Sequence, residues 1–177
     1  IITCDFISLT IMLPNNYDYR NMIEKINETD KIKPLFKEYL EYISQFYKIK
    51  HLDSWYKKAL KNLYLYEKDN DHYIYIVTDA DFVIGFALIN KHLRFNKNGF
   101  AIAEFYIQKS HMKKGIGRKL ASHIFKQLPG NWEVAVALQN KSAFQFWNQV
   151  IAACTKGKFQ KKVKKTFDGY GFTFNTE

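Results

Sequence analysis

Cysteine is scarce in this chain of 177 residues, where Cys4 and Cys154 are the only two. Metal sites need closely spaced cysteine and histidine ligands, and neither these two residues nor the five histidines show such spacing. We therefore expect no metal site, and two free thiols in a reducing compartment.

The chain also lacks a long hydrophobic run. Its apolar N-terminal stretch, residues 1–13, is interrupted by the polar residues Thr3, Asp5, Ser8 and Thr10. This stretch is too short and too polar to span a bilayer, and it lacks the basic residues that open a signal peptide. We expect a cytoplasmic protein with no membrane partner.

Acidic residues are few compared with basic ones. Asp and Glu total 17 against 27 Lys and Arg, which gives a net charge of +10. This excess favours a polyanionic cofactor, nucleic acid or an anionic surface as a partner. A compositional interpretation also stays open, because Lys, Asn, Ile and Tyr are all abundant, as in proteins from AT-rich genomes.

What the chain does contain is enough apolar material for a folded domain. Hydrophobic residues make up 47% and aromatic residues 17%, which excludes a disordered chain. No repeat, linker or low-complexity block divides the sequence. We predict an N-terminal extension over residues 1–19 and a single domain over residues 20–177.

The spacing of apolar residues changes along the domain between helical and strand-like periods. The helical period predicts helices over residues 30–46, with Thr29 or Asp30 as N-cap, after Asp53-Ser54, over 115–128 and over 141–151. Alternation predicts strands over residues 20–26, 73–77, 83–90, 100–108 (after a turn at Asn98-Gly99) and 132–138, and a closing hairpin around Asp168-Gly169. The order β-α-α-β-β-β-α-β-α-β-β predicts a mixed α/β sheet in one layered domain.

Residues 112–120, Met-Lys-Lys-Gly-Ile-Gly-Arg-Lys-Leu, form the most informative segment. This glycine-spaced basic loop follows a predicted strand and opens an amphipathic helix, so its backbone N–H groups and the helix dipole favour a bound phosphate. It is not a Walker loop, because no Gly-Lys-Ser/Thr follows, and it lacks the third glycine and the later acidic residue of a dinucleotide fingerprint. The same glycine spacing also occurs in ordinary turns, and Gly169-Tyr170-Gly171 is predicted to be one.

A second motif lies at residues 140–147, Asn-Lys-Ser-Ala-Phe-Gln-Phe-Trp. Together with residues 104–117, it resembles the acetyl-CoA-binding core of the GNAT superfamily of N-acetyltransferases. Residues 129–134, Pro-Gly-Asn-Trp-Glu-Val, are similar to a group of uncharacterised bacterial predicted acetyltransferases. The resemblance implies a GNAT-like fold, with a central, mostly antiparallel mixed sheet flanked by helices. It also implies an acyltransferase that uses acetyl-CoA (coenzyme A) as cosubstrate.

The resemblance further implies which residues hold the cosubstrate. The coenzyme A pyrophosphate would be bound by backbone amides of Lys113, Lys114, Gly115, Ile116, Gly117 and Arg118. The main chain of Ile107 would hydrogen-bond the pantetheine arm and polarise the thioester carbonyl. Asn140 would reach the same arm, directly or through water, and Trp147 would lie beside the cosubstrate.

Two positions depart from the family pattern. Met112 stands where arginine or glutamine is usual, so Lys113 or Lys114 must supply the positive charge. Trp147 stands where many members have a tyrosine that protonates the leaving thiolate, a proton that an indole cannot supply. A thiol with a pKa of about 8.5 also leaves as the thiolate, so this departure does not forbid the reaction.

Catalysis needs a group that deprotonates the acceptor, because an amine with a pKa near 10.4 is almost entirely protonated at pH 7. Glu104 is the only carboxylate on the strand before the loop, and strand alternation places it opposite Phe105 and Ile107. We predict that Glu104 is the general base, and that Tyr106, on the same face, is an acid or orients the substrate. An ion pair on a solvated strand face is the alternative interpretation of Glu104.

The sequence thus predicts acetyl transfer from acetyl-CoA to a primary amine of a small molecule or protein. No cysteine lies in the motif region, so the amine would attack directly in a ternary complex. The alternatives are a basic RNA-binding protein and a non-catalytic acyl-CoA-binding protein on the same fold. The lysines between residues 156 and 165 would then contact RNA, or the adenosine 3′-phosphate, or simply form a solvated strand face. The acceptor stays open, as does the choice between monomer and homodimer.

Overall fold

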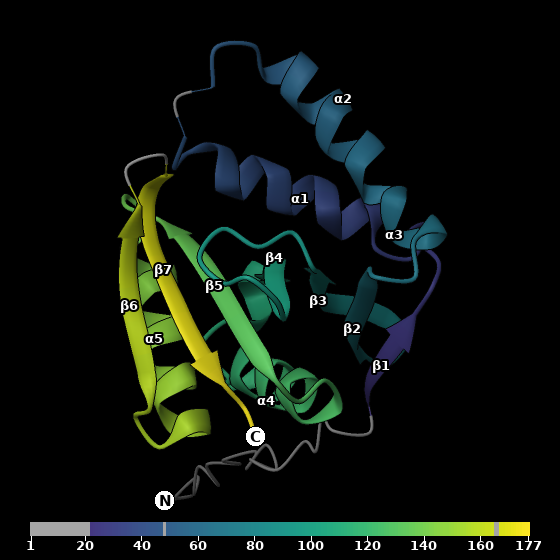
Figure 1. Ribbon diagram of the computed structural model, residues 1–177. Coiled ribbons are helices and arrows are strands. Elements are labelled where there is room, and N and C mark those ends of the chain that lie inside the picture. Colours follow the sequence, from purple (N-terminus) through teal and green to yellow (C-terminus); the bar gives the residue numbers. More distant parts are fainter. Residues whose placement is uncertain (1–21, 48, 165–166) are drawn as a thin grey trace, which may run out of the picture.

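The computed structural model describes residues 22–47, 49–164 and 167–177. Its centre is a seven-stranded sheet with the strand order β1-β2-β3-β4-β5-β7-β6 (Figure 1). The strands are β1 (Ile23–Ile26), β2 (Tyr73–Asp79), β3 (Phe82–Asn90), β4 (Phe100–Ile107), β5 (Asn131–Ala137), β6 (Phe159–Lys164) and β7 (Phe167–Asn175). Neighbouring strands are antiparallel except β4 and β5, which run parallel. The predicted mixed, mostly antiparallel sheet is confirmed.

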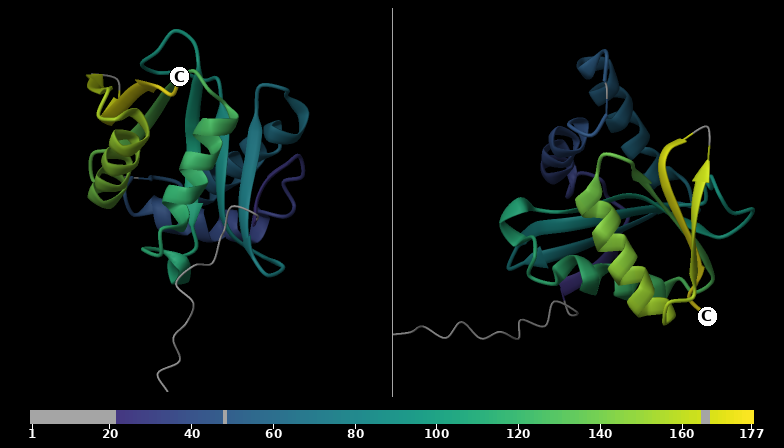
Figure 2. Two further views of the ribbon diagram at one scale, coloured as in Figure 1. Left: turned by 90° about the horizontal axis from the view of Figure 1, so that it is seen from below. Right: turned by 90° about the vertical axis from the view of Figure 1, so that its left-hand side faces the viewer.

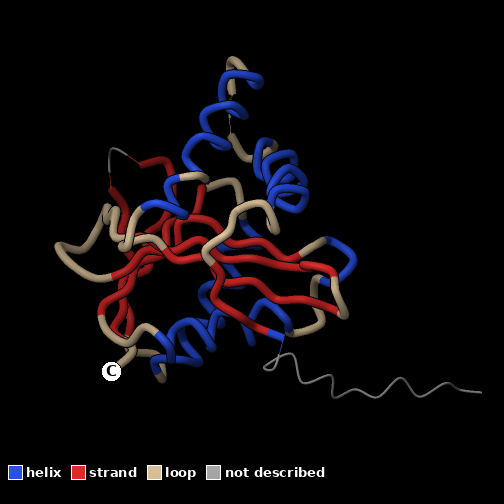
Figure 3. The backbone as a smooth tube through the Cα atoms, turned by 90° about the vertical axis from the view of Figure 1, so that its right-hand side faces the viewer, coloured by secondary structure: helices blue, strands red, loops and turns tan. Residues whose placement is uncertain are grey.

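Helices cover both faces of this sheet (Figures 2 and 3). They are α1 (Lys33–Ser44), α2 (Leu52–Leu63), α3 (Leu65–Lys68), α4 (Ile116–Gln127) and α5 (Lys141–Thr155), with a 3-10 turn at Lys109–His111. The apolar stripes of α1 and α3 pack on one face, and those of α4 and α5 pack on the other. Two hydrophobic cores therefore lie on opposite sides of the sheet, and α2 projects away from it beyond α1 (Figure 1).

The start of α1 differs from the prediction. Thr29 and Asp30 do not cap this helix, whose N-cap is Ile32 without a side-chain hydrogen bond. Thr29 is instead fully buried, and both its backbone N–H and its hydroxyl donate to the Glu67 carboxylate. The Thr29 hydroxyl, which the local sequence predicts as a helix cap, is thus hydrogen-bonded to a distant carboxylate. Pro34 stiffens the first turn of α1 instead.

The predicted turn at Asp168-Gly169 is wrong, although the closing hairpin exists. Gly169 and Gly171 lie inside β7, where they pair with Ala137 and Ala135 of β5. A Cβ at Gly169 would lie 2.2 Å from the Val136 carbonyl oxygen, and one at Gly171 would lie 2.4 Å from the Phe95 ring. These glycines therefore permit close packing within a strand and do not reverse the chain.

The connection between β3 and β4 is a longer loop than the predicted tight turn. Gly99 does adopt a positive φ of 122°, but residues 91–99 all separate the two strands. The buried Glu133 of β5 accepts backbone N–H groups from Arg94, Phe95 and Asn96, at 2.5, 2.9 and 2.9 Å. One carboxylate therefore folds this loop over β5.

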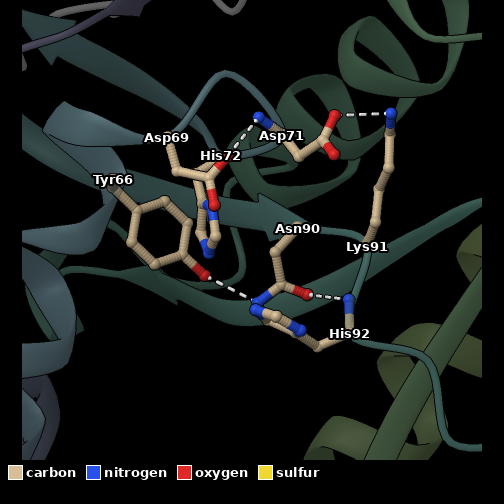
Figure 4. Close-up of polar contacts among 7 residues, drawn as sticks. All are labelled: Tyr66, Asp69, Asp71, His72, Asn90, Lys91 and His92. Atoms are coloured by element: carbon tan, nitrogen blue, oxygen red, sulfur yellow. Dashed lines mark hydrogen bonds and ion pairs between the residues drawn. The ribbon is translucent and has the colours of Figure 1, made fainter.

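A polar cluster joins α3 to the ends of β2 and β3 (Figure 4). The Asn90 side-chain amide donates to the Tyr66 hydroxyl at 3.0 Å, and the backbone N–H of His92 donates to Asn90 Oδ1 at 3.0 Å. The ring of His72 lies edge-on to Tyr66, with centroids 4.6 Å apart. Across the described ranges, no group of three His, Cys, Asp or Glu residues is arranged to hold a metal ion. The hydrogen bond between Tyr66 and Asn90 attaches α3 to the end of β3.

The remaining sequence predictions concern the termini and thiols. Residues 1–19, the predicted extension, and Cys4 lie outside the described residues. Cys154 is a free, exposed thiol near the end of α5. No helix in the described part of the chain is both long enough and apolar enough to cross a membrane.

Candidate active site

The central feature of the site is a wedge between β4 and β5. These parallel strands pair only from Phe100 to Ile102 on β4, against Trp132 to Val134 on β5. Both strands continue beyond this point, β4 to Ile107 and β5 to Ala137. Their facing backbone groups therefore have no cross-strand partner there, and an extended ligand can bind to such a strand edge.

The hydrogen-bond pattern identifies which backbone groups face the wedge. Gln108 N–H donates to the Ile84 carbonyl at 2.7 Å, and the β3–β4 register pairs Tyr106 with Phe86 and Ile107 with Gly85. Because hydrogen-bonded and non-hydrogen-bonded pairs alternate in an antiparallel ladder, residues 104, 106 and 108 bond to β3. The N–H and C=O groups of Phe105 and Ile107 therefore point toward β5. This is the orientation that the predicted role of Ile107 requires.

The predicted phosphate loop closes one end of the wedge. Lys113 and Gly115 both have positive φ angles, 62° and 81°, which turn the chain sharply into α4. The first helical bond runs from Lys119 N–H to the Gly115 carbonyl at 3.1 Å. The N–H groups of residues 116–118 therefore precede it and are directed out of the helix N-terminus, the geometry that favours an anion.

Side chains around the loop explain its composition. Gly117 is closely packed, because an added Cβ would lie 3.2 Å from the Phe146 ring and 3.4 Å from the Ile107 side chain, so a larger residue would require these side chains to shift. Met112 packs against both hydrophobic cores, so an apolar residue stands at this position to join them. His111 contacts Ser110 through Nδ1 at 2.9 Å and Asp79 through Nε2 at 3.4 Å, so both ring nitrogens already have partners.

The second motif faces the loop from the start of α5. Asn140 is the N-cap of α5, and its Oδ1 accepts from Ala143 N–H at 3.0 Å and from the Ser142 hydroxyl at 3.1 Å. Only its side-chain NH₂ is left for a ligand. Trp147 is 5% exposed and packs edge-on against Phe105 and Phe146, with both centroid distances at 4.9 Å. The indole thus forms part of the apolar wall of the wedge.

Glu104 lies on the opposite face of β4, beneath α1, where it accepts a hydrogen bond from the Tyr39 hydroxyl. The residue is partly exposed to solvent, yet protein surrounds its carboxyl densely enough that burial raises its pKa to about 7. The Tyr39 hydrogen bond and the positive charge of Arg94 oppose this rise. The solvated ion pair considered from sequence is not what the structure contains. The carboxyl is instead poised to exchange a proton near neutral pH.

Tyr106 shares this face, as strand alternation predicts. Its hydroxyl donates to Glu38 Oε1 at 2.8 Å. Burial, together with the hydrogen bond and negative charge of Glu38, raises the pKa of Tyr106 above its ordinary value. Tyr106 is therefore a weak acid whose proton is already engaged.

One cavity of about 870 Å³ connects these groups. Its lining includes Ile107, Lys113, Gly115, Gly117, Arg118, Asn140 and Trp147 on one side, and Tyr39, Tyr42, Tyr47, Glu104 and Tyr106 on the other. Lys114 and Ile116 do not line it: Lys114 is exposed to solvent, and Ile116 is buried in the core. The structure thus brings Glu104 and the predicted cosubstrate residues other than Lys114 and Ile116 to a single cavity.

Two residues near Glu104 and Tyr106, Glu38 and Arg94, were not identified from the sequence. The helical spacing of Tyr39 favours the core and leaves a place in the acceptor pocket open, and the structure has this residue both buried and lining the cavity. Tyr39 and Glu38 belong to α1, and their contacts with β4 span 65 and 68 residues. Arg94 belongs to the loop held by Glu133. No local pattern reports contacts this distant. The nearest signal is Glu133 itself, a lone acid in an otherwise apolar strand.

Comparison with known proteins identifies the family of this chain. The sequence model of the Acetyltransferase (GNAT) family matches residues 34–150, more than half of the chain. The chain belongs to this family. Its members are acetyltransferases, so the resemblance read from the two motifs is confirmed, and the chain is a GNAT acetyltransferase. A search of curated protein sequences finds no match.

Solved structures of acetyltransferases share the fold. An acetyltransferase from Thermus thermophilus superposes with a TM-score of 0.64 and 13% identity, over 87% of this chain and 97% of its own. A putative GNAT acetyltransferase from Desulfovibrio desulfuricans superposes with a TM-score of 0.61 and 10% identity, over 88% of this chain and 98% of its own. The PaiA N-acetyltransferase from Thermoplasma acidophilum, in complex with coenzyme A, superposes with a TM-score of 0.60 and 17% identity, over 86% of this chain and 98% of its own.

The raised pKa of Glu104 predicts that Glu104→Gln stabilises this GNAT protein at neutral pH. The carboxyl has a pKa of about 4.5 in the unfolded chain, so the folded state holds the proton more tightly. Ionisation between pH 4.5 and 7 therefore lowers the free energy of unfolding. Below pH 4.5 the variant and the wild type should have the same free energy of unfolding. Above pH 7 it should be more stable by about 2 kcal/mol, after allowance for solvent screening.

Thermal unfolding scans from pH 4 to 8 measure this effect. We expect the melting temperature of Glu104→Gln to exceed that of the wild type by about 4–8 °C above pH 7. Glu24→Gln, at an exposed position of β1, is the control, and its melting temperature should stay close to that of the wild type at each pH. A constant difference across the pH range would contradict the raised pKa.

Proposed function

We propose that the protein transfers an acetyl group from acetyl-CoA to a primary amine, by direct attack in a ternary complex. The wedge between β4 and β5 carries this proposal, because it presents the backbone of Phe105 and Ile107 to a cavity that ends at the N-terminus of α4. A pantetheine arm would bond to the strand edge, and the pyrophosphate would bind the loop at residues 113–118.

The reaction balances with groups that line the cavity. The amine nitrogen attacks the thioester carbonyl carbon, a C–N bond forms, and the C–S bond breaks with its electron pair on sulfur. Glu104 accepts one proton from the incoming ammonium group, which frees the nitrogen lone pair, and the second N–H proton passes to water as the C–N bond forms. The Ile107 N–H donates to the carbonyl oxygen as negative charge develops there. Much of the rate gain would come from positioning the amine beside the thioester.

The leaving sulfur departs as a thiolate in this mechanism. Trp147 has no acidic proton to give, and the raised pKa of Tyr106 makes its hydroxyl a poorer donor than an ordinary tyrosine. A thiol with a pKa of about 8.5 needs little assistance. We assign Tyr106 an orienting role in the acceptor half of the cavity, and Asn140 a contact with the pantetheine arm through its NH₂ group.

We further propose that residues 20–177 act as one catalytic domain, because all seven strands belong to one sheet. A covalent acetyl-cysteine is not required, since Cys154 lies outside the cavity lining. RNA binding is not favoured by membership of an acetyltransferase family. The lysines of β6 lie on an edge strand, where charge also prevents edge-to-edge pairing.

Acetyl-CoA binding tests the proposal, with Gly117→Val as the informative variant. The added side chain collides with Phe146 and occupies space at the helix N-terminus. We expect the dissociation constant for acetyl-CoA, measured by calorimetry, to rise about tenfold to 100-fold, the equivalent of 1–3 kcal/mol.

Lys126→Val, at an exposed position on α4, is the matched control and should bind normally. Circular dichroism must match for the wild type and both variants. Wild-type protein that shows no heat of binding and no thiol release with any amine would overturn the proposed function.

A further inference from the structure

The acceptor half of the cavity differs sharply in composition from the half assigned to the cosubstrate. Its lining from α1, the segment after it and the same face of β4 comprises Tyr39, Tyr42, Ile43, Tyr47, Ala103, Glu104 and Tyr106. Four of these seven residues are tyrosines, and one is a carboxylate. The acceptor half therefore offers aromatic surface and a single negative charge.

Three of these tyrosines, Tyr39, Tyr42 and Tyr106, form a continuous group of rings. The Tyr106 ring lies 5.7 Å from Tyr39 and 5.6 Å from Tyr42 between centroids, and Tyr42 is edge-on to Phe46 at 5.4 Å. Tyr39 donates its hydroxyl proton to Glu104, and Tyr106 donates its own to Glu38. Two of the four hydroxyls are thus engaged within the protein, which leaves ring surface as the main contact for a ligand.

The charges in the cavity limit how many amino groups an acceptor can carry. Among the described residues that line it, Glu104 is the one carboxylate, while Lys113, Arg118 and Lys119 add positive charge. Glu67 and Asp69, in and after α3, do not line it. One ammonium group can approach Glu104, but no second carboxylate among the lining residues is available to balance another.

We propose that the acceptor is a small primary monoamine whose body is aromatic, and that Tyr42 is a residue that determines this specificity. This inference rests on the proposed acetyl transfer. Aromatic rings attract both the ammonium group, by cation–π interaction, and a flat apolar body, by stacking. Tyr42 is only partly buried, it lines the cavity, and its ring extends the aromatic surface of Tyr106 outward.

The experiment compares kcat/KM for acetyl transfer from acetyl-CoA to four amines. We expect 2-phenylethylamine to exceed n-hexylamine, a straight-chain monoamine, by about tenfold, and to exceed spermidine and kanamycin by about 100-fold or more. A peptide with a free N-terminus is included as a fifth acceptor. Preference for the polyamine, the aminoglycoside or the peptide, or equal rates for all of them, would overturn the inference.

Variants at Tyr42 test the assigned residue. Tyr42→Ala should raise KM for 2-phenylethylamine about tenfold and reduce its advantage over n-hexylamine, with a smaller effect on kcat. Tyr42→Phe retains the ring and should resemble the wild type, which separates ring contact from general damage. Tyr64→Ala, an exposed tyrosine outside the cavity, is the matched control. An unchanged ratio of the two amines in Tyr42→Ala would contradict the role of this ring.

Failure of this inference can be distinguished from failure of the proposed function. Acetyl-CoA binding is measured by calorimetry in the absence of any amine, so it does not depend on the acceptor. Binding of acetyl-CoA together with transfer to the wrong amine overturns only the acceptor class. Absence of acetyl-CoA binding overturns the proposed function, and this inference with it.

Discussion

Glu104→Gln is expected to lower kcat for acetyl transfer by about 10²–10³-fold, the contribution typical of a positioned general base. The amide has nearly the shape of the carboxyl and can still accept the Tyr39 hydrogen bond, but it cannot take a proton from the amine. In the wild type, kcat should rise as the pH increases through about 7, the pKa of Glu104, because only the ionised form accepts a proton. In the variant this rise should disappear.

Two comparisons separate a base from a merely structural residue. An acceptor amine whose pKa lies below that of Glu104 is already neutral, so the variant should lose much less activity with it than with an ordinary alkylamine. Calorimetry should give similar acetyl-CoA affinities for wild type and variant. Equal losses with both amines, or a rise near pH 7 that persists in the variant, would contradict the role of Glu104 as base.

Local patterns in the sequence were sufficient for the elements that carry contiguous motifs. The phosphate loop, α4 and the start of α5 each depend on signals within a few residues: Gly115 at a positive φ, Pro129-Gly130 after α4, and Asn140 as the cap of α5. The predicted ranges for these helices differ from the observed ones by four residues at most. The alternation along β4 likewise placed Glu104 and Tyr106 on the same face.

The errors share one physical cause, which is contact between distant segments. Thr29 resembles a helix cap, but Glu67 takes its hydroxyl. Gly169 and Gly171 resemble a turn, but they lie in a strand because the backbone of β5 and the ring of Phe95 approach them closely. Propensity reports what a residue does among its neighbours in sequence, and tertiary contacts override it.

The chemistry of Glu104 illustrates the same limit within the site. Its position and face followed from β4 alone. Its pKa, in contrast, depends on burial beneath α1, which raises it, and on Tyr39 and Arg94 of other segments, which lower it. Sequence therefore predicted the candidate but not the property that makes it suitable as a base. That property exists only after the helix and the loop have closed over the strand.

The second large effect is expected at Glu133, which holds the loop at residues 91–99 against β5. Glu133→Ala should lower the free energy of unfolding by about 3 kcal/mol, because it leaves three backbone N–H groups of the loop without their buried carboxylate. For a chain of this length the melting temperature should fall by about 6–12 °C. Chemical denaturation and thermal scans measure the loss.

Glu28→Ala, at an exposed position before α1, is the control and should change stability by less than about 0.5 kcal/mol. Glu133→Gln distinguishes charge from shape, since its amide keeps one acceptor oxygen but places a donor group against the remaining N–H groups. We expect the free energy of unfolding of Glu133→Gln to lie between those of the wild type and Glu133→Ala. A loss as small as that of the control would mean that water replaces the carboxylate without cost.

The same variant should also change the pH dependence of catalysis. Arg94 lowers the pKa of Glu104, and Arg94 is held in the loop by the bond from its backbone N–H to Glu133. Once the loop is released, this positive charge no longer has a fixed place near the carboxyl, and the rise in kcat should move to higher pH. An unchanged pH profile in a destabilised Glu133→Ala protein would show that Arg94 keeps its place through its ring contact with Phe167, 5.0 Å away.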